Sequence, residues 1–393
     1  MMKRFVALLF GVCLMGWNGA QAQEKAEKEI PEVEKTLFER IMGKTARSRN
    51  LSVDLNTRLA FYVGMGEAEK GAAFRADYLR LQVNARITDW ITVRWYQHLN
   101  KSFRTGSVDG MPASVDCLGV GFEWTPTLSS FIGKQYADFG GFEYDADPAE
   151  VYEYSDFGNE VTCFLLGANL MWQVTPTQEL RVQVVDGRSD SAEETYGVLP
   201  AGFRAAKVPL GYTLNWNGAF CGERLTTRCS FTAFHEGRGE NVWMGALGAA
   251  WREGRFGAYV DVMGSAEGID KLGLLSEVSQ GTETGARATD CGYVTVVSRL
   301  DFRPLPKLNV FVKGSYETAG LYRAGNGMER GNYRRTWGVQ GGVEYFPMTE
   351  NLRFFARYGG KEIRFTDRAL AWGVTGRGRH GVSFGVLYKI PVF

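Results

Sequence analysis

Residues 381–393 end the chain with GVSFGVLYKIPVF, in which apolar side chains alternate with small or polar ones. The apolar face consists of Val382, Phe384, Val386, Tyr388 and Ile390. This period-two alternation predicts a β-strand whose two faces meet different surroundings. A last strand leaves an open hydrogen-bonding edge, which promotes aggregation unless another strand covers it. Because residues 51–63, LSVDLNTRLAFYV, alternate in the same way, we expect the two ends to pair and to close a barrel.

The composition suits a β architecture. A chain of 393 residues has room for two domains or for one large β structure. Its 45 Lys and Arg residues balance 44 Asp and Glu residues, so the overall charge gives no indication of nucleic-acid binding. Glycine (49) and tyrosine (17) are abundant, whereas histidine (3) is scarce. Abundant glycine with aromatic residues is typical of many turns and strands.

The N-terminus has the features of a secretory signal peptide, which we place at residues 1–22. Lys3 and Arg4 precede an apolar run over residues 5–17, and Ala20-Gln21-Ala22 is a small-residue cleavage site. The apolar run is shorter than the roughly 20 residues that a membrane helix needs. We therefore expect an exported protein that enters a membrane with strands.

Residues 23–50 follow as a charged segment with one short helical pattern. Ile30, Val33, Leu37 and Ile41 recur at spacings of three to four residues, and Pro31 lies near the first turn. We expect a periplasmic N-terminal segment with a short amphipathic helix. A contact between subunits is the alternative.

From residue 51 onward the chain repeats a strand, a tight turn, a strand and a longer polar loop. The tight turns are expected at residues 88–90, 125–127, 175–178, 221–223, 252–254, 303–306 and 347–350. Seven hairpins and the two terminal strands predict an all-β fold, a transmembrane antiparallel β-barrel of about sixteen strands over residues 51–393. Strands of about 9–13 residues can cross a bilayer at a tilt.

The tryptophans distinguish a membrane barrel from a soluble sandwich, which would show the same alternation. Four of them lie next to the short turns: Trp90, Trp124, Trp172 and Trp251. Outer-membrane barrels carry such a girdle at the membrane interface. We therefore favour the membrane barrel.

Residues 131–141, FIGKQYADFGG, and a last strand that ends in Phe393 resemble bacterial outer-membrane porins, and specifically the phosphate-selective porin O and P family. The resemblance implies passive diffusion of small hydrophilic solutes with a preference for anions such as phosphate. It also implies a homotrimer among the lipid and lipopolysaccharide of a Gram-negative outer membrane. One departure is that Phe393 falls out of register with Tyr388 and Ile390, and a bulge near Pro391 would restore it.

The polar face of the strands should line a wet lumen, because a Lys or Arg at mid-membrane on the lipid face costs about 2–4 kcal/mol. The cations assigned to this face are Arg58, Arg80, Arg86, Arg94, Lys134, Arg181, Arg228, Arg255, Arg299, Lys313, Arg353, Arg357 and Lys389. The fewer inward acids are Asp54, Glu123, Asp186, Asp261, Asp301 and Glu344. A net basic wall favours anions. The alternative is that these cations only pair with acids across strands.

Negative charge is concentrated in the third long loop, residues 138–160. Its carboxylates are Asp138, Glu143, Asp145, Asp147, Glu150, Glu153, Asp156 and Glu160, and it contains no Lys or Arg. The resemblance to porins implies that this loop folds into the barrel and constricts it. A solvated surface loop and a calcium-binding loop are alternatives, although the carboxylate spacing fits no EF-hand.

Two further loops are basic and could either funnel anions inward or bind the phosphates of surface lipid. Their cations are Arg323, Arg330, Arg334, Lys361, Arg364, Arg368, Arg377 and Arg379. The five cysteines after the signal peptide show no CxxC spacing, and HExxH and phosphate-loop motifs are missing from the sequence. We expect no cofactor, metal or catalytic site. A structural or adhesive barrel without an open pore, or a hydrolase built on a barrel, remain alternatives.

Overall fold

The protein is described here by a computed structural model that covers residues 35–42, 50–66, 71–281, 285–325 and 327–393. The expected signal peptide and most of the segment before residue 51 lie outside the described residues. From that segment the structure describes one short helix, α2 (Leu37–Met42). Phe38 of α2 packs edge-on against Phe393, with ring centroids 5.4 Å apart, so the helix covers the end of the last strand.

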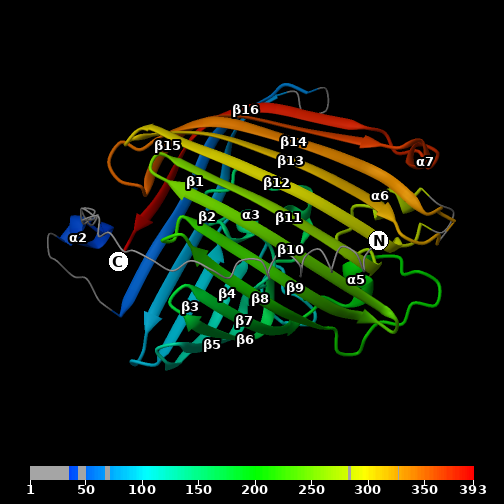
Figure 1. The fold of residues 1–393 in the computed structure, drawn as a ribbon, viewed down its shortest axis with the longest axis horizontal. Coiled ribbons are helices and arrows are strands. Elements are labelled where there is room, and N and C mark those ends of the chain that lie inside the picture. Colours follow the sequence, from blue (N-terminus) through cyan, green and yellow to red (C-terminus); the bar gives the residue numbers. More distant parts are fainter. Residues whose placement is uncertain (1–34, 43–49, 67–70, 282–284, 326) are drawn as a thin grey trace.

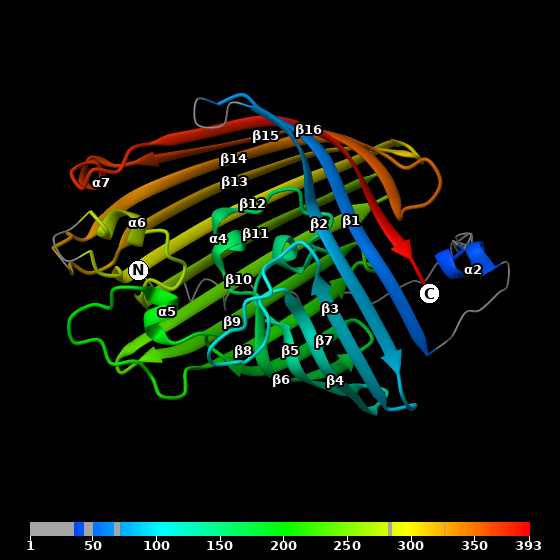
Figure 2. The same ribbon diagram turned by 180° about the vertical axis from the view of Figure 1, so that it is seen from behind.

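Sixteen antiparallel strands form a closed barrel within the described residues (Figures 1 and 2). The strands are β1 (Leu51–Gly64), β2 (Gly71–Arg86), β3 (Ile91–His98), β4 (Val115–Thr125), β5 (Leu128–Tyr136), β6 (Phe164–Thr175), β7 (Gln178–Asp186), β8 (Leu210–Phe220), β9 (Leu225–Gly237), β10 (Glu240–Glu253), β11 (Phe256–Ile269), β12 (Thr289–Leu305), β13 (Leu308–Leu321), β14 (Gly331–Tyr345), β15 (Leu352–Phe365) and β16 (Arg377–Pro391). The prediction of a sixteen-stranded barrel is confirmed.

The two terminal strands close the barrel, as the alternating patterns predict. β1 pairs with β16, so that Leu55 faces Ile390 and Phe61 faces Phe384. At the end of the chain both Val392 N and Phe393 N donate to the carbonyl of Val53, at 2.7 and 3.0 Å. Two residues thus oppose one, which is the bulge expected after Pro391.

Short connections occur at all seven expected turns, but the prediction of a long loop between β9 and β10 is wrong. β9 and β10 are joined through residues 238 and 239 rather than by a long polar loop. Gly239, with a φ of 86°, supplies the left-handed residue that this tight turn needs. At the other end of the barrel, the exposed Trp90 and Trp124 form an aromatic group with the partly buried Phe122 beside the turns, and the rings of Phe122 and Trp124 are stacked at 5.3 Å.

The remaining helices in the described part of the chain are short and lie in the loops. They are α3 (Phe142–Asp145), α4 (Asp156–Glu160), α5 (Ala192–Tyr196), α6 (Ser276–Ser279) and α7 (Asp367–Leu370). α3 and α4 lie within the outline of the barrel, whereas α5, α6 and α7 lie at the end opposite the C-terminus (Figures 1 and 2). None of the described helices is long and apolar enough to cross a membrane.

Much of the apolar core lies inside the barrel, where two loops meet the wall. Phe139 and Phe157 of the third loop share one buried cluster with Met263 of β11, and Leu275 of the β11–β12 connection belongs to the same cluster. The sequence patterns did not single out this second inward-folding loop. Its burial shows that the loop side of the barrel is filled by more than the acidic loop alone.

Candidate functional site

The acidic loop leaves β5 along the inner wall. The backbone N–H of Asp138 donates to Gln183 of β7 at 2.8 Å, and the Asp138 carboxylate pairs with Arg181 at 3.0 Å. Asn215 of β8 donates to the Asp138 carbonyl at 2.9 Å. These contacts from inward-facing residues direct the chain into the barrel from Asp138, the first residue of the loop.

Asp261 of β11 then fixes the start of α3. Its carboxylate accepts the backbone N–H groups of Phe142 and Glu143, at 2.9 and 2.7 Å, and so satisfies donors at the helix N-terminus. A Cβ on Gly141 would lie 2.3 Å from this carboxylate, which explains the glycine at that position. Gly140, with a φ of 102°, makes the turn before it.

Glu143 joins the two halves of the loop to the wall. Its side chain is completely buried, forms an ion pair with Lys313 of β13, and accepts the Ser155 N–H at 2.9 Å. The Ser155 hydroxyl caps α4 by accepting the Gly158 N–H at 3.1 Å. A single buried carboxylate thus fixes both short helices of the loop against one strand.

The middle of the loop crosses to the seam between β1 and β16. Asp147 pairs with Lys389 at 2.9 Å and Glu150 pairs with Arg353 at 3.0 Å. Arg58 donates to the carbonyls of Ala149 and Val151, at 2.7 and 2.8 Å. Burial opposes ionisation of the Asp147 carboxyl, but Lys389 and Arg80 outweigh it and lower its pKa.

The second half of the loop lies against β13 to β15. The Tyr152 ring stacks on Phe311 at 5.6 Å, and its hydroxyl donates to Glu344 at 2.7 Å. Asp156 pairs with Arg334 at 2.6 Å and with Lys361 at 2.8 Å. Burial again opposes ionisation, yet these two cations lower the pKa of Asp156.

The charges of loop and wall match closely. Of the eight predicted loop carboxylates, all except Glu160 pair with a cation of the strands. The ten cations that pair with them are Arg80, Arg181, Arg228, Lys313, Arg334, Arg353, Arg357, Lys361, Arg379 and Lys389. Three of these cations also contact wall carboxylates, namely Asp116, Glu179 and Glu344. Within the described residues, positive and negative groups are therefore nearly equal in number at this junction, where Lys101 also contacts Asp116 at 3.6 Å.

Two of the assigned wall cations lie elsewhere. Arg255 is in the tight turn between β10 and β11, where it donates to the carbonyl of Pro304 at 3.0 Å. Lys134 is the register partner of Leu118 and thus belongs to the outward-facing row of β5. The rule against outward charge fails here because Asp109 of the 99–114 connection covers Lys134 and pairs with it at 3.1 Å.

Arg86 marks the rim rather than the middle of the wall, since it pairs with Glu123 at 2.8 Å beside the β2–β3 turn. Asp186 follows the buried, inward-facing Val185 and so faces outward, like Lys134. Arg299 lies on the inward row and pairs with Asp301 at 2.9 Å. Most of the assigned cations are therefore paired with an acid, but more of these acids belong to the 138–160 loop than to a neighbouring strand.

Arg334 and Lys361 were assigned to surface loops but lie on β14 and β15, facing inward. Extending the period-two pattern of Arg353 and Arg357 to residue 361 would have placed Lys361 correctly. Among the assigned cations that do face inward in the described part of the chain, Arg58 and Arg94 make no ion pair, but only Arg94 is exposed. Arg94 lies in register with Asn84 and Gly119 and has its guanidinium 5.5 Å from the Phe131 ring.

Within the described residues, no group of His, Cys, Asp and Glu side chains is arranged to hold a metal ion. No disulfide joins the five cysteines in this part of the chain.

A closed sixteen-stranded barrel with an apolar outer face, an inward polar face and an acidic loop docked inside defines an outer-membrane porin of a Gram-negative bacterium. The sequence agrees, because the family model of phosphate-selective porin O and P matches residues 55–372. The chain belongs to this family.

Solved structures show the same fold at low sequence identity. The outer membrane channel DcaP of Acinetobacter baumannii superposes with a TM-score of 0.61 at 10% identity, covering 88% of this chain and 99% of that one. OmpF of Salmonella typhi, in complex with daunomycin, superposes with a TM-score of 0.58 at 13% identity, covering 86% of this chain and 98% of that one. An anion-selective porin from Comamonas acidovorans superposes with a TM-score of 0.53 at 10% identity, covering 86% of this chain and 98% of that one. No curated protein matches the chain in sequence.

Proposed function

We propose that this porin allows small hydrophilic solutes to cross the outer membrane by passive diffusion, and that residues 138–160 form its constriction. The ion pairs between this loop and the inner wall support the proposal, since they hold the loop across the interior. An adhesive or purely structural barrel would have no need of a loop fixed inside it. Single-channel conductance in a planar bilayer tests the proposal, and a folded protein without conductance would refute it.

We further propose a preference for small anions such as phosphate, carried by Arg94. Most loop and wall charges are paired with each other, whereas Arg94 is exposed on the inward face and makes no ion pair among the described residues. The carboxylates of Asp261 and Glu317, which accept only N–H and O–H groups from their surroundings, are buried under the loop. A solute in the lumen would therefore meet the uncompensated positive charge rather than these negative ones.

The reversal potential in a KCl gradient measures this preference. Chloride should be the more permeant ion, and Arg94→Gln should reduce its advantage, most strongly at low salt where the Debye length is longest. Arg255→Gln removes the same charge from a turn and should change the reversal potential less. Phosphate added as a competitor should lower the chloride current through the wild type more than through the Arg94→Gln variant. Clear cation selectivity of the wild type would contradict the proposal.

A homotrimer is proposed as the working assembly. The wall from β3 to β7 is built of strands of 8 to 12 residues, shorter than the 13 to 17 residues of β9 to β16. Its outward side chains Trp95, Leu118 and Ile132 are large, apolar and exposed. Cross-linking in mild detergent should give a trimer band, and a monomer alone would refute the assembly.

A further inference from the structure

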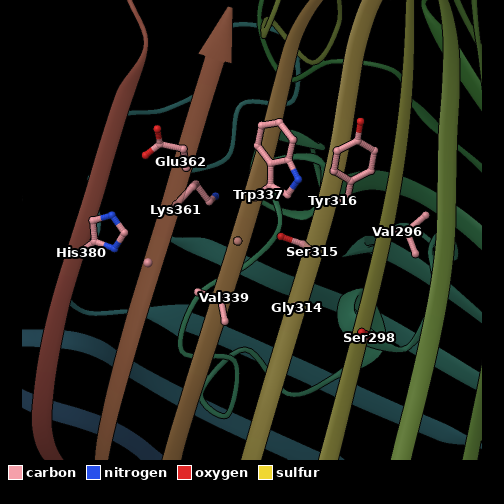
Figure 3. A pocket seen from close by; sticks show the side chains of 12 residues that line it. Val296, Ser298, Gly314, Ser315, Tyr316, Trp337, Val339, Lys361, Glu362 and His380 are labelled. Carbon is pink, nitrogen blue, oxygen red and sulfur yellow. The ribbon is translucent and has the colours of Figure 1, made fainter.

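A groove crosses the outer face of the barrel where β12 to β16 meet the membrane. It has a volume of about 450 Å³. Its depth comes from small residues, Ser298, Gly314 and Gly360, at positions where neighbouring outward residues are large. Tyr316 and Trp337 stand side by side at one edge, and Val296 and Val339 flank the groove (Figure 3).

Two arginines lie on the outward face just beyond this aromatic edge, toward the loop end. Arg335 precedes Trp337 by two residues on β14 and is the register partner of Arg364 on β15. Arg364 extends over the indole, with its guanidinium 5.5 Å from the Trp337 ring. Both arginines are exposed.

Like charges directly opposite each other on neighbouring strands are destabilising. Arg335 makes no ion pair within the described residues, and Arg364 has only a long contact of 3.5 Å to the Glu362 carboxylate. An anion between the two guanidinium groups would relieve their repulsion, and phosphate suits the forked donors of arginine. The order of the features is that of a membrane interface, with cations outermost, then aromatic rings, then an apolar groove.

We propose that this surface binds a phosphorylated lipid of the membrane. The phosphate lies between Arg335 and Arg364, and one acyl chain lies in the groove past Trp337. The groove is largely apolar, and its polar lining includes Glu362 and His380, the latter in contact with the Tyr358 hydroxyl at 2.7 Å. When the lipid binds, its phosphate replaces the Glu362 carboxylate as the partner of Arg364, whose contact to Glu362 is as long as 3.5 Å. This site lies outside the lumen and does not depend on conduction.

Native mass spectrometry of the full protein in a non-ionic detergent, titrated with dipalmitoyl phosphatidate, tests the proposal. The wild type should retain the lipid, and Arg335→Gln with Arg364→Gln should weaken retention at least tenfold. The matched control is Arg252→Gln with Arg255→Gln, two arginines at the opposite end of the barrel, which should bind as the wild type does. Dipalmitoylglycerol, which lacks the phosphate, should bind poorly to all three proteins.

Two further arms separate lipid from free phosphate and test the groove. Excess inorganic phosphate should not displace the lipid; displacement would mean that the arginines form a free-anion site and would overturn the lipid assignment. Gly314→Leu should fill the groove and weaken binding without harming the fold, because a Cβ there has no neighbour closer than 3.9 Å. Unchanged binding in this variant, or in the double arginine variant, would refute the proposal. Both variants should conduct as the wild type does.

Discussion

Excision of residues 142–157 separates the charge of the proposed constriction from the charge of the wall. The structure holds the two ends of this segment near each other, because Glu143 bonds Ser155 and a Cβ on Gly158 would lie 2.9 Å from the Glu143 carboxylate. Gly141 and Gly158 can therefore be joined by a short glycine linker without pulling on β5 or β6. The wall itself remains as it is.

The excised segment contains Glu143, Asp145, Asp147, Glu150, Glu153 and Asp156 but no Lys or Arg. The lumen thus becomes more positive by six charges. A charge about 10 Å from a passing ion, in water, contributes about 0.4 kcal/mol without screening. Six such charges give about 2.5 kcal/mol, and screening at 0.1 M salt, where the Debye length is about 10 Å, leaves roughly 1 kcal/mol. At that salt the partition of chloride should rise about fivefold, and the partition of potassium should fall by about the same factor.

The expected result is a higher single-channel conductance together with a reversal potential shifted toward anions. The shift should grow as salt is lowered from 1 M to 0.01 M, because the Debye length increases from about 3 to 30 Å. A loop with the six carboxylates replaced by their amides is the matched control, since it removes the charge and keeps the bulk. Folding is checked by faster migration on an unheated gel. Unchanged conductance and selectivity in a folded excision variant would show that the loop lies outside the solute path.

Three further predictions follow from the same contacts. Lys313→Met leaves the buried Glu143 carboxylate without its cation, which costs about 3–5 kcal/mol of folding free energy; adding Glu143→Gln should recover most of the urea stability, and equal stability of the two variants would contradict the buried pair. The pKa values of Asp147 and Asp156 are lowered from 3.8, so their contribution to loop docking is complete above pH 3.8 and is lost as pH falls through the lowered values; conductance should therefore rise as pH falls below about 4, and an unchanged conductance of the folded protein there would refute this assignment. Deleting residues 381–393 leaves β1 and β15 with open edges in lipid, where each unsatisfied backbone group costs several kcal/mol, so no heat-modifiable band should form.

The fold could be predicted because its signals are local. Alternation of side chains defines each strand, and turn residues mark each hairpin, so strand count and closure followed without knowledge of tertiary contacts. The errors arose where a neighbour far along the chain changes the rule. Lys134 faces outward because Asp109, 25 residues earlier, covers it. Lys361 was assigned to a loop because β15 extends beyond the length needed to cross the membrane.

The pairing of loop and wall could not be predicted from the sequence. Alternation shows which face a cation is on, but the partners are far apart: Lys361 lies 205 residues from Asp156, and Lys389 lies 239 residues from Glu150. The acidic loop and the basic wall were each recognised. Their near-complete mutual compensation was not, and it changes the expectation from a strongly basic lumen to one in which Arg94 stands out.

Ion pairs and aromatic rings contribute differently to the docking of this loop. A buried ion pair gains little net free energy, because desolvation offsets most of the attraction. A buried aromatic side chain contributes roughly 1.5–3 kcal/mol, and Phe139 and Phe157 are both almost completely buried. The rings therefore supply most of the free energy that holds the loop in the barrel, while the carboxylates determine where along the wall it lies, since each misplaced carboxylate would be left buried without a cation. Acidic and aromatic residues thus have separate roles in docking this loop against a basic wall, as the proposed constriction requires.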